Sequence, residues 1–339
     1  MSMCRSNCWT GLFPTKKSFI IFVMYIGLSM NHGLLIKLSQ KNGTYNYDVI
    51  SVIILTEVIK LIISFFLFCI ENPLRSIINL TKENYPVLFL YMVPSFLYCL
   101  YNYLAFVNLS LFDPTTYFIF LQLRVLLIGV IYQCLFKKEL SKMQWCSLIL
   151  LTIGCIIKEL KIDVNLRQQS YNYFTSLLLI LTQILCSCLA GVYNEYLLKK
   201  GQGAKVNVYL QNIYMYVDSI ICNLFVWTIF KINENNKSST SQTDIFKSYL
   251  VMLIVINSAV YGVITSLLLQ TLNSIMKVFA TAIELVLIVI FSWVLLGYPI
   301  TLQTVTAVMI VSCSVVLYAK HPIAKNTLPI NDNKNIIHS

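Results

Sequence analysis

Apolar runs of about 20 residues alternate with short polar segments along most of this chain. Each run is long enough to cross the hydrocarbon core of a bilayer as a helix, which takes about 20 residues. The pattern therefore predicts ten transmembrane helices, with the joint at 108–113 so short that the third and fourth form a hairpin. The runs cover residues 18–38, 48–70, 86–107, 114–136, 143–160, 172–194, 207–230, 248–270, 275–296 and 300–319.

The composition of the 339 residues also indicates an integral membrane protein. Apolar residues make up 58% and charged residues 12%, against about 45–50% and 25% in soluble globular chains. The mean hydropathy is +0.73. Residues 1–17 are polar and basic, and the apolar run that follows lacks a clear small-residue cleavage site. We therefore expect this run to be the first span rather than a signal peptide that is removed.

The basic residues predict the orientation in the membrane. On a soluble protein the net charge of +11 would suggest nucleic acid, but here most Lys and Arg lie in short loops, so no nucleic-acid partner is expected. With ten crossings, the side that carries both termini holds 14 Lys and Arg and the other side holds 8. The positive-inside rule then makes both termini cytosolic. Sequons at Asn42 and Asn236 fall on the luminal side as candidate glycosylation sites.

Two stretches of the chain resemble each other weakly. Residues 114–152 and 274–312 each contain a span, a short turn and a second span, and a shift of 160 residues superposes the two turns. Five spans per half is an odd number, so the second half would be inverted in the membrane, as in alternating-access transporters. The pattern predicts five parts along the chain: 1–17 cytosolic segment, 18–160 first five-helix repeat, 161–171 luminal connector, 172–319 second five-helix repeat, 320–339 cytosolic tail.

Neither a metal nor a cofactor is expected. Most of the eleven cysteines lie inside apolar runs, where Cys behaves as a small hydrophobe. No C-x-x-C occurs, and His32, His321 and His338 are scattered along the chain. This spacing does not fit a zinc site.

Several charged residues lie inside the predicted spans. A charge at the bilayer centre costs about 2.5–3.5 kcal/mol even on the most lenient insertion scale, so these side chains should face the interior of the bundle. Glu57 and Lys60 are three residues apart and share a helix face. They are interpreted as structural or gating charges, and Glu284 is grouped with them. The alternatives for the pair are an internal ion pair and a contact with substrate.

Two cations remain without an acidic neighbour in their own helix. Arg124 lies in the fourth span, and Lys277 lies in the ninth, two turns before Glu284. Two cations near the membrane midplane favour an anionic ligand such as a phosphate, to which Arg offers a planar fork and Lys a point charge. The alternative is that Glu57, Asp218 or Glu284 pairs with them across helices. Polar and aromatic side chains in nearby spans could stack on a nucleobase or read its edge. Helix packing explains many of the tyrosines equally well. These candidate side chains are Tyr98, Asn102, Tyr117, Gln122, Asn212 and Tyr216.

Several motifs resemble a known family over residues 11–320. The motifs are Leu55-Thr-Glu-Val-Ile-Lys-Leu61, Tyr101-Asn-Tyr-Leu-Ala-Phe106, Tyr117 to Arg124, Ala190-Gly-Val-Tyr-Asn-Glu-Tyr196 and Asn273 to Thr281. They resemble the nucleotide-sugar transporters of the CMP-sialic acid and UDP-galactose group. The resemblance implies a fold of the drug/metabolite transporter type. It also implies a Golgi antiporter, not an enzyme, that exchanges a nucleotide sugar for a nucleoside monophosphate.

The resemblance also assigns substrate-binding roles. It places Arg124 and Lys277 by the phosphates, and around the nucleotide it places Tyr98, Asn102, Tyr117, Asn212, Tyr216 and Ser266. Sialic-acid-type members have a lysine at the position of Gln270 and a small residue at that of Glu284. A lost cation and a gained anion disfavour a substrate with an extra carboxylate. UDP-galactose is therefore the expected substrate and UMP its counter-substrate, with UDP-N-acetylglucosamine or another nucleotide sugar as the alternative.

Two other classes of protein fit the sequence less well. A membrane acyl- or glycosyltransferase would need a nucleophile or an acid–base set, and His32 has no carboxylate partner in the sequence. A non-transporting scaffold of the same fold would not need the buried cations. The expected partners are a nucleotide sugar, a nucleoside monophosphate and the lipid bilayer, with a homodimer left open.

Overall fold

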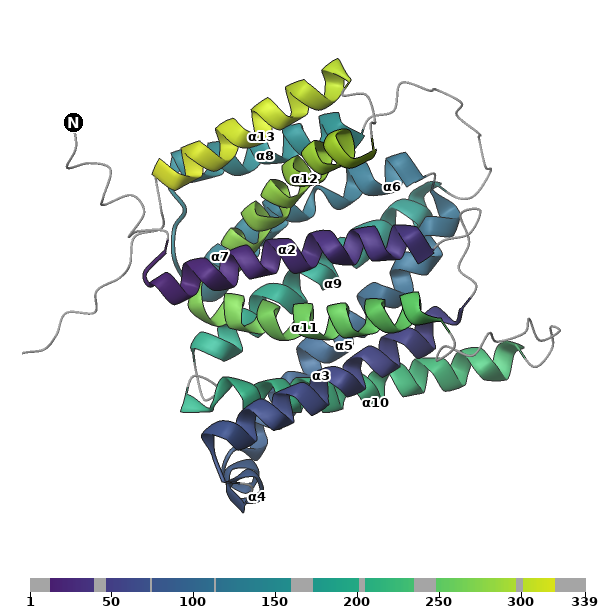
Figure 1. Cartoon of the computed structure of the whole chain (residues 1–339), viewed down its shortest axis with the longest axis vertical. Coiled ribbons are helices and arrows are strands. Elements are labelled where there is room, and N and C mark those ends of the chain that lie inside the picture. Colours follow the sequence, from purple (N-terminus) through teal and green to yellow (C-terminus); the bar gives the residue numbers. More distant parts are fainter. Residues whose placement is uncertain are drawn as a thin grey trace, which may run out of the picture.

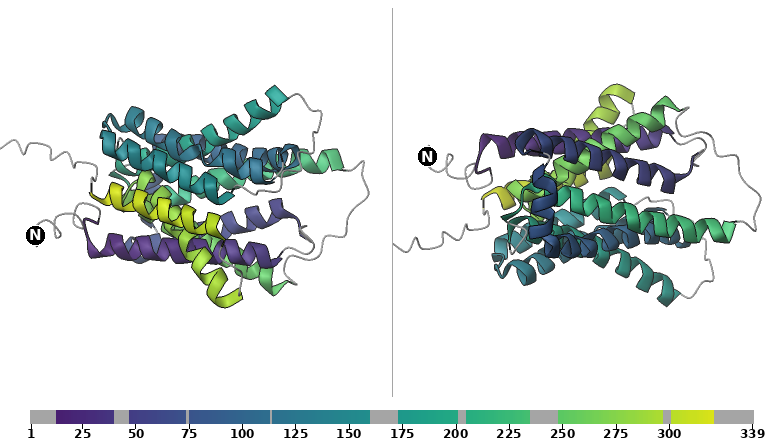
Figure 2. Two further views of the ribbon diagram at one scale, coloured as in Figure 1. Left: turned by 90° about the horizontal axis from the view of Figure 1, so that it is seen from above. Right: turned by 90° about the horizontal axis from the view of Figure 1, so that it is seen from below.

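The computed structural model describes residues 13–39, 47–73, 75–112, 114–159, 173–200, 205–234, 248–296 and 301–320. These residues form helices joined by turns, and none of them forms a strand. Figure 1 shows the helices lying side by side, and Figure 2 shows that most share one direction. The helices are α2 (Lys16–Ser39), α3 (Val49–Glu71), α4 (Arg75–Glu83), α5 (Tyr85–Leu111), α6 (Pro114–Leu121), α7 (Arg124–Phe136), α8 (Lys142–Glu159), α9 (Tyr173–Lys199), α10 (Val208–Glu234), α11 (Tyr249–Thr271), α12 (Ser274–Leu296) and α13 (Leu302–Lys320).

The described helices confirm an all-helical, multi-pass membrane protein. Within the described residues, seven helical segments are long and apolar enough to cross a bilayer, and residues 142–157 form a shorter apolar helix. Large apolar side chains face outward where a soluble protein would place polar ones, as at Phe19, Ile20 and Phe66. The count of ten spans in two inverted repeats stays a prediction. The candidate glycosylation sites Asn42 and Asn236 lie outside the described residues.

The helices pack as a series of pairs. The most extensive contacts join α8 with α13, α5 with α9, α3 with α10, and α2 with α11. In Figure 1, the α8–α13 pair lies at one edge of the bundle and the α3–α10 pair at the opposite edge. Gly154 permits the α8–α13 contact, because a Cβ there would lie 2.8 Å from Cγ2 of Val311 and 3.2 Å from its backbone nitrogen.

The ends of several helices are fixed by their own polar residues. At the start of α8, Ser141 and Gln144 form a reciprocal cap: the Ser141 N–H donates to Oε1 of Gln144 at 2.7 Å, and the Gln144 N–H donates to Oγ of Ser141 at 3.3 Å. Asp48 caps α3 by accepting the N–H of Ile50 at 3.1 Å. These caps place the polar segments of the sequence between the helices, where the pattern predicts them.

Two features of the fold differ from the sequence-based expectation. A short extra helix, α4, lies between the second and third predicted spans, with hydrophobic and polar residues on opposite faces. The predicted span 114–136 is not one continuous helix, because α6 ends at Leu121 and α7 begins at Arg124. No Pro or Gly lies at residues 122–123, so neither of the usual helix breakers marks the interruption.

Candidate functional site

The interruption of the fourth span lies directly before Arg124. The Gln122 N–H donates to the Ile119 carbonyl at 3.1 Å and the Leu123 N–H to the Phe120 carbonyl at 3.0 Å, so the chain tightens into three-residue turns there. Gln122 therefore lies in the turn and Arg124 is the first residue of α7. The N-terminus of a helix carries a partial positive charge. The guanidinium and the helix dipole together favour a negative ligand beside Arg124.

Lys277 is also in the first turn of its helix. The side chain of Asn273 caps α12 by accepting the N–H of Met276 at 2.7 Å, which places Lys277 just inside the helix. The positive charges of Arg124 and Lys277 are close enough to interact electrostatically. The ion pairs found among the described residues are Glu57–Lys60 and Glu195–Lys199. Neither Arg124 nor Lys277 therefore has a carboxylate partner in the part of the chain that is described.

The three acids that could pair with these cations are placed elsewhere or held by other groups. Glu57 accepts a hydrogen bond from Nζ of Lys60 at 2.7 Å within α3. Asp218 is buried on α10, and its Oδ2 has no hydrogen-bond partner among the described residues. Glu284 accepts a hydrogen bond from Oγ of Ser29 at 2.6 Å.

A hydrogen-bonded group of polar side chains surrounds Glu284 inside the bundle. The Tyr261 hydroxyl donates to the Tyr25 hydroxyl at 2.9 Å, and Oγ of Ser29 lies 3.4 Å from the Tyr261 hydroxyl. The charges of both Glu284 and Arg124 act on each of these two tyrosines. The group therefore connects α2, α11 and α12 with the first residue of α7.

Tyr117 belongs to a second polar chain that ends near Arg124. Its hydroxyl accepts a hydrogen bond from Nε2 of Gln183 at 2.8 Å, and Oε1 of Gln183 accepts one from Asn108 at 2.7 Å. The charge of Arg124 acts on Tyr117. Asn108 is buried in this network.

The remaining predicted residues lie on α5, α10 and α11. Asn212 donates to Oγ of Ser266 at 2.7 Å, which ties α10 to α11. Tyr216 is fully buried, and Nζ of Lys60 lies 5.5 Å from its ring centroid. Tyr98 is close enough to interact with Tyr261 and Tyr216. Tyr98 therefore connects this group to the residues around Arg124.

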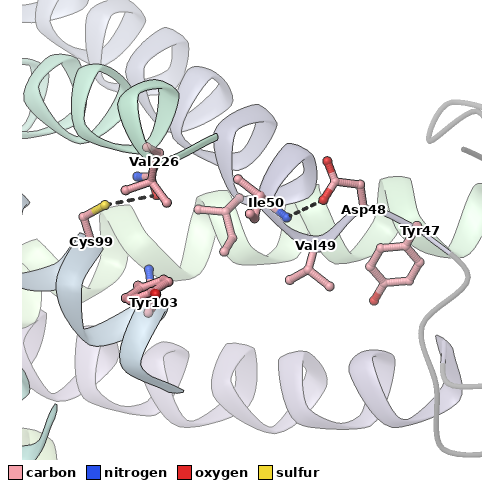
Figure 3. A pocket seen from close by; sticks show the side chains of 10 residues that line it. Tyr47, Asp48, Val49, Ile50, Cys99, Tyr103 and Val226 are labelled. Atoms are coloured by element: carbon pink, nitrogen blue, oxygen red, sulfur yellow. Dashed lines mark hydrogen bonds between the residues drawn. The ribbon is translucent and has the colours of Figure 1, made fainter. Parts of the chain in front are cut away.

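Asn102, four residues after Tyr98 on α5, lines a pocket of about 350 Å³ between α3, α5 and α10. Figure 3 shows Cys99 and Tyr103 of α5 on one side of this pocket and Tyr47 and Asp48 on the other. The pocket lies where α3 begins and where α5 and α10 approach their ends. We call this end of the bundle the pocket end.

At the opposite end of the bundle, a buried carboxylate joins neighbouring helices. Glu195 on α9 accepts the N–H and the hydroxyl of Ser274, both at 2.6 Å, and Nζ of Lys199 at 2.7 Å. Lys199 also donates to the carbonyl of Leu272. Glu195 is fully buried, and it joins the end of α9 to the junction of α11 and α12. We call this the Glu195 end.

Sequence reasoning did not select several residues of these networks. They are Tyr25, Ser29, Gln183, Glu195, Tyr261 and Ser274. A signal existed for Tyr25 and Ser29, which are four residues apart on one face of the first span. Gln183 stands alone in an apolar run, which also marks it as a residue that needs a partner inside the bundle. Within the described residues, no group of three His, Cys, Asp or Glu side chains could hold a metal ion.

Comparison with known proteins assigns the chain to a family. The family model described as "Nucleotide-sugar transporter" matches residues 15–319. The chain belongs to the nucleotide-sugar transporter family. Within this family it is 41% identical to the UDP-galactose transporter senju of Drosophila melanogaster, over 94% of this chain and 90% of the relative.

More distant relatives and one solved structure match as well. CMP-sialic acid transporter 1 of Oryza sativa subsp. japonica is 29% identical over 88% of this chain and 93% of the relative. CMP-sialic acid transporter 1 of Arabidopsis thaliana is 29% identical over 93% of both chains. A solved crystal structure superposes with a TM-score of 0.66 at 12% identity, over 89% of this chain and 96% of that chain. It supports the fold alone.

Proposed function

We propose that this transporter exchanges UDP-galactose for UMP across the Golgi membrane. The observation that carries the proposal is the pair Arg124 and Lys277. Both cations lie inside the bundle in first turns of helices, their charges interact, and no described carboxylate pairs with either. Phosphate oxygens are the partners that such groups bind best. The similarity to a UDP-galactose transporter supports the choice of nucleotide sugar.

The surrounding side chains fit the other parts of the ligand. Tyr117 lies near Arg124, Tyr98 lies near Tyr261, and both offer ring faces and hydroxyl groups. Asn212 and Ser266, which are hydrogen-bonded to each other, offer an amide and a hydroxyl for the edge of a base. The break before Arg124 has the form of the discontinuous helices from which many transporters build midplane sites. We assign these residues to nucleotide recognition.

The helix pairing supports two inverted five-helix repeats. If α6 and α7 together are counted as the fourth of ten spans, each span corresponds to the span five positions away along the chain. Under this correspondence, the contact between α5 and α9 is equivalent to the contact between α2 and α11. In the same way, the α5–α10 contact is equivalent to the α3–α11 contact, and the α7–α9 contact is equivalent to the α2–α12 contact. Each of these partners is itself a contact in the bundle. This regularity is expected if two similar halves pack around a pseudo-twofold axis.

Alternating access would then use the two ends of the bundle. With both termini cytosolic, the Glu195 end faces the cytosol and the pocket end faces the lumen. α9 packs against α11 and α12 at the Glu195 end. The corresponding luminal contacts, of α2 with α5 and of α2 with α6 or α7, are not among the substantial helix contacts of the described residues. We assign this structure to a state that is closed toward the cytosol.

Exchange in proteoliposomes tests the proposal. Proteoliposomes that contain the purified protein and are loaded with UMP should take up labelled UDP-galactose. UDP-N-acetylglucosamine and CMP-sialic acid serve as competitors. Arg124→Ala and Lys277→Ala should each weaken UMP binding by about 10–150-fold, because a charge-assisted hydrogen bond is worth about 1.5–3 kcal/mol. Lys205→Ala, which removes an exposed cation, is the matched control. Wild-type UMP affinity in both site variants would refute the assignment. Absence of exchange by the wild-type protein would refute the function and favour a scaffold.

A further inference from the structure

We propose that Glu284 restricts this transporter to nucleotide sugars whose sugar is uncharged. The inference rests on the proposed function and adds a substrate class to it. Glu284 is a carboxylate inside a site otherwise expected to be cationic, and it is part of the same polar group as Arg124, through Tyr25 and Tyr261. Its role must therefore be compatible with an anionic ligand close by.

The position of Glu284 along α12 separates it from the phosphates. Lys277 and Glu284 are seven residues apart, which places them on one helix face about 10.5 Å apart along the axis. Lys277 is near the Glu195 end and Glu284 is two turns further into the membrane. A ligand whose phosphates reach Lys277 and Arg124 would direct its attached sugar along this face. Glu284 is then adjacent to the sugar.

The side chains around Glu284 are suited to hydroxyl groups. Ser29, Tyr25 and Tyr261 provide three hydroxyls linked by contacts of 2.6–3.4 Å that end on the carboxylate. His32 extends the group, since it stacks on Tyr261 with 5.9 Å between ring centroids and lies 2.9 Å from Oγ of Ser258. A carboxylate and hydroxyls can exchange hydrogen bonds with the hydroxyls of a neutral hexose.

The charge balance explains why a charged sugar would be rejected. Arg124, Lys277 and Glu284 together carry a charge of +1, while a diphosphate brings two negative charges that engage the cations. A carboxylate on the sugar would meet the negative charge of Glu284 where little water screens it. Like charges in such a setting oppose binding and provide selectivity by repulsion.

The proposed repeat relates the positions of Arg124 and Glu284. Arg124 and Glu284 are 160 residues apart, the shift that superposes the two halves of the sequence. Residues related by a pseudo-twofold axis approach each other when they lie close to that axis. The two positions are therefore related by the repeat, with the cation in one half and the anion in the other, and no ion pair joins them among the described residues.

The first test uses the wild-type protein with three ligands as competitors of UMP exchange. UDP-galactose, UDP-galacturonate and the uronamide of UDP-galacturonate differ only at C6, and only the second has a charged sugar. UDP-galacturonate should compete at least tenfold more weakly than UDP-galactose, and the uronamide should compete within about threefold of it. Equal competition by UDP-galacturonate would overturn the proposal. A uronamide as weak as the acid would also overturn it, because shape and not charge would then decide.

The second test assigns the effect to Glu284. In Glu284→Gln the ratio of UDP-galacturonate to UDP-galactose affinity should rise at least tenfold, whereas in Glu284→Asp, which keeps the charge, it should stay below threefold. A purely structural role would weaken all three ligands together and leave the ratio as in the wild type, which would refute the assignment. If Glu284→Gln does not fold, Glu284→Ser, which also removes the charge, replaces it, and an unaltered ratio there would count against the proposal. If UMP itself is not exchanged by the wild type, the proposed function fails instead, and the two failures are distinguishable.

Discussion

Replacing Glu57 with Gln tests whether the ion pair on α3 is structural. Nζ of Lys60 lies 2.7 Å from Oε1 of Glu57, and the two side chains are only 17% and 13% exposed. The methylenes of Lys60 pack against Gly262 on α11, where a Cβ would lie 2.5 Å from Cε. The ammonium cannot easily move to water, so Glu57→Gln would leave a charge in the bundle without its partner.

The expected cost follows from this geometry. Removing one partner of a buried ion pair costs about 3–5 kcal/mol, and the partial exposure of this pair places the expected value near the lower limit, about 3 kcal/mol. Glu57→Gln should therefore lower abundance in membranes and the melting temperature in detergent. The double variant Glu57→Gln with Lys60→Gln should recover both, because it removes the unpaired charge.

The assay measures abundance, melting temperature and initial uptake rate for both single variants and the double variant. Glu83 and Lys82 lie exposed on α4, so changing both to Gln is a matched control that should alter none of the three quantities. A structural pair requires that uptake per molecule recovers together with abundance in the double variant. A double variant that is abundant and stable but inactive would refute this reasoning and place Glu57 and Lys60 in the transport mechanism.

Three further outcomes are expected. Glu195→Gln should weaken the contacts at the Glu195 end, because a neutral amide holds Lys199 and Ser274 less strongly. Labelling of a cysteine introduced near Ser274 should then increase from the cytosolic side, and unchanged labelling would contradict this role. Gly154→Ala should lower the melting temperature, because its Cβ would lie 2.8 Å from Val311 and backbone atoms prevent an easy shift. Gly27→Ala is the control and should leave the melting temperature unchanged, because the new Cβ has open space around it. A tag after Ser339 should be cleaved by protease added to sealed Golgi vesicles, and a protected tag would disprove the cytosolic placement of the termini.

The sequence predicted the helical elements well because their signal is local. An apolar run bounded by polar residues identifies a span, and α3, α9 and α11 begin and end within a few residues of the prediction, apart from the last turn of α9. The break before Arg124 was not predicted, because no Pro or Gly marks it and the polar residues Gln122 and Arg124 were interpreted as side chains that face the interior of the bundle.

The candidate site was predictable in its charges and less so in its contacts. Arg124 and Lys277 were identifiable because a cation in an apolar span needs a partner. The placement of Glu284 beside Ser29 depends on α2 packing against α12, and these helices are more than two hundred residues apart in the chain. Glu195 was missed because it lies beside Lys199 at the end of a span, a position typical of a surface ion pair. Its complete burial becomes evident only when α11 and α12 cover it.

The hydrogen bonds at the Glu195 end bear on how tightly the two half-reactions of the proposed exchange are coupled. Three donors from two helix segments converge on one carboxylate, and each charge-assisted hydrogen bond contributes about 1.5–3 kcal/mol. An empty carrier would have to break these bonds without compensation, so its spontaneous opening toward the cytosol should be rare. A bound nucleotide that draws Arg124 and Lys277 together could supply the missing free energy through its binding. Under this scheme, the hydrogen bonds of Glu195 limit transport of a substrate without exchange for its counter-substrate. Weakening these hydrogen bonds should therefore convert strict exchange into slow net flux.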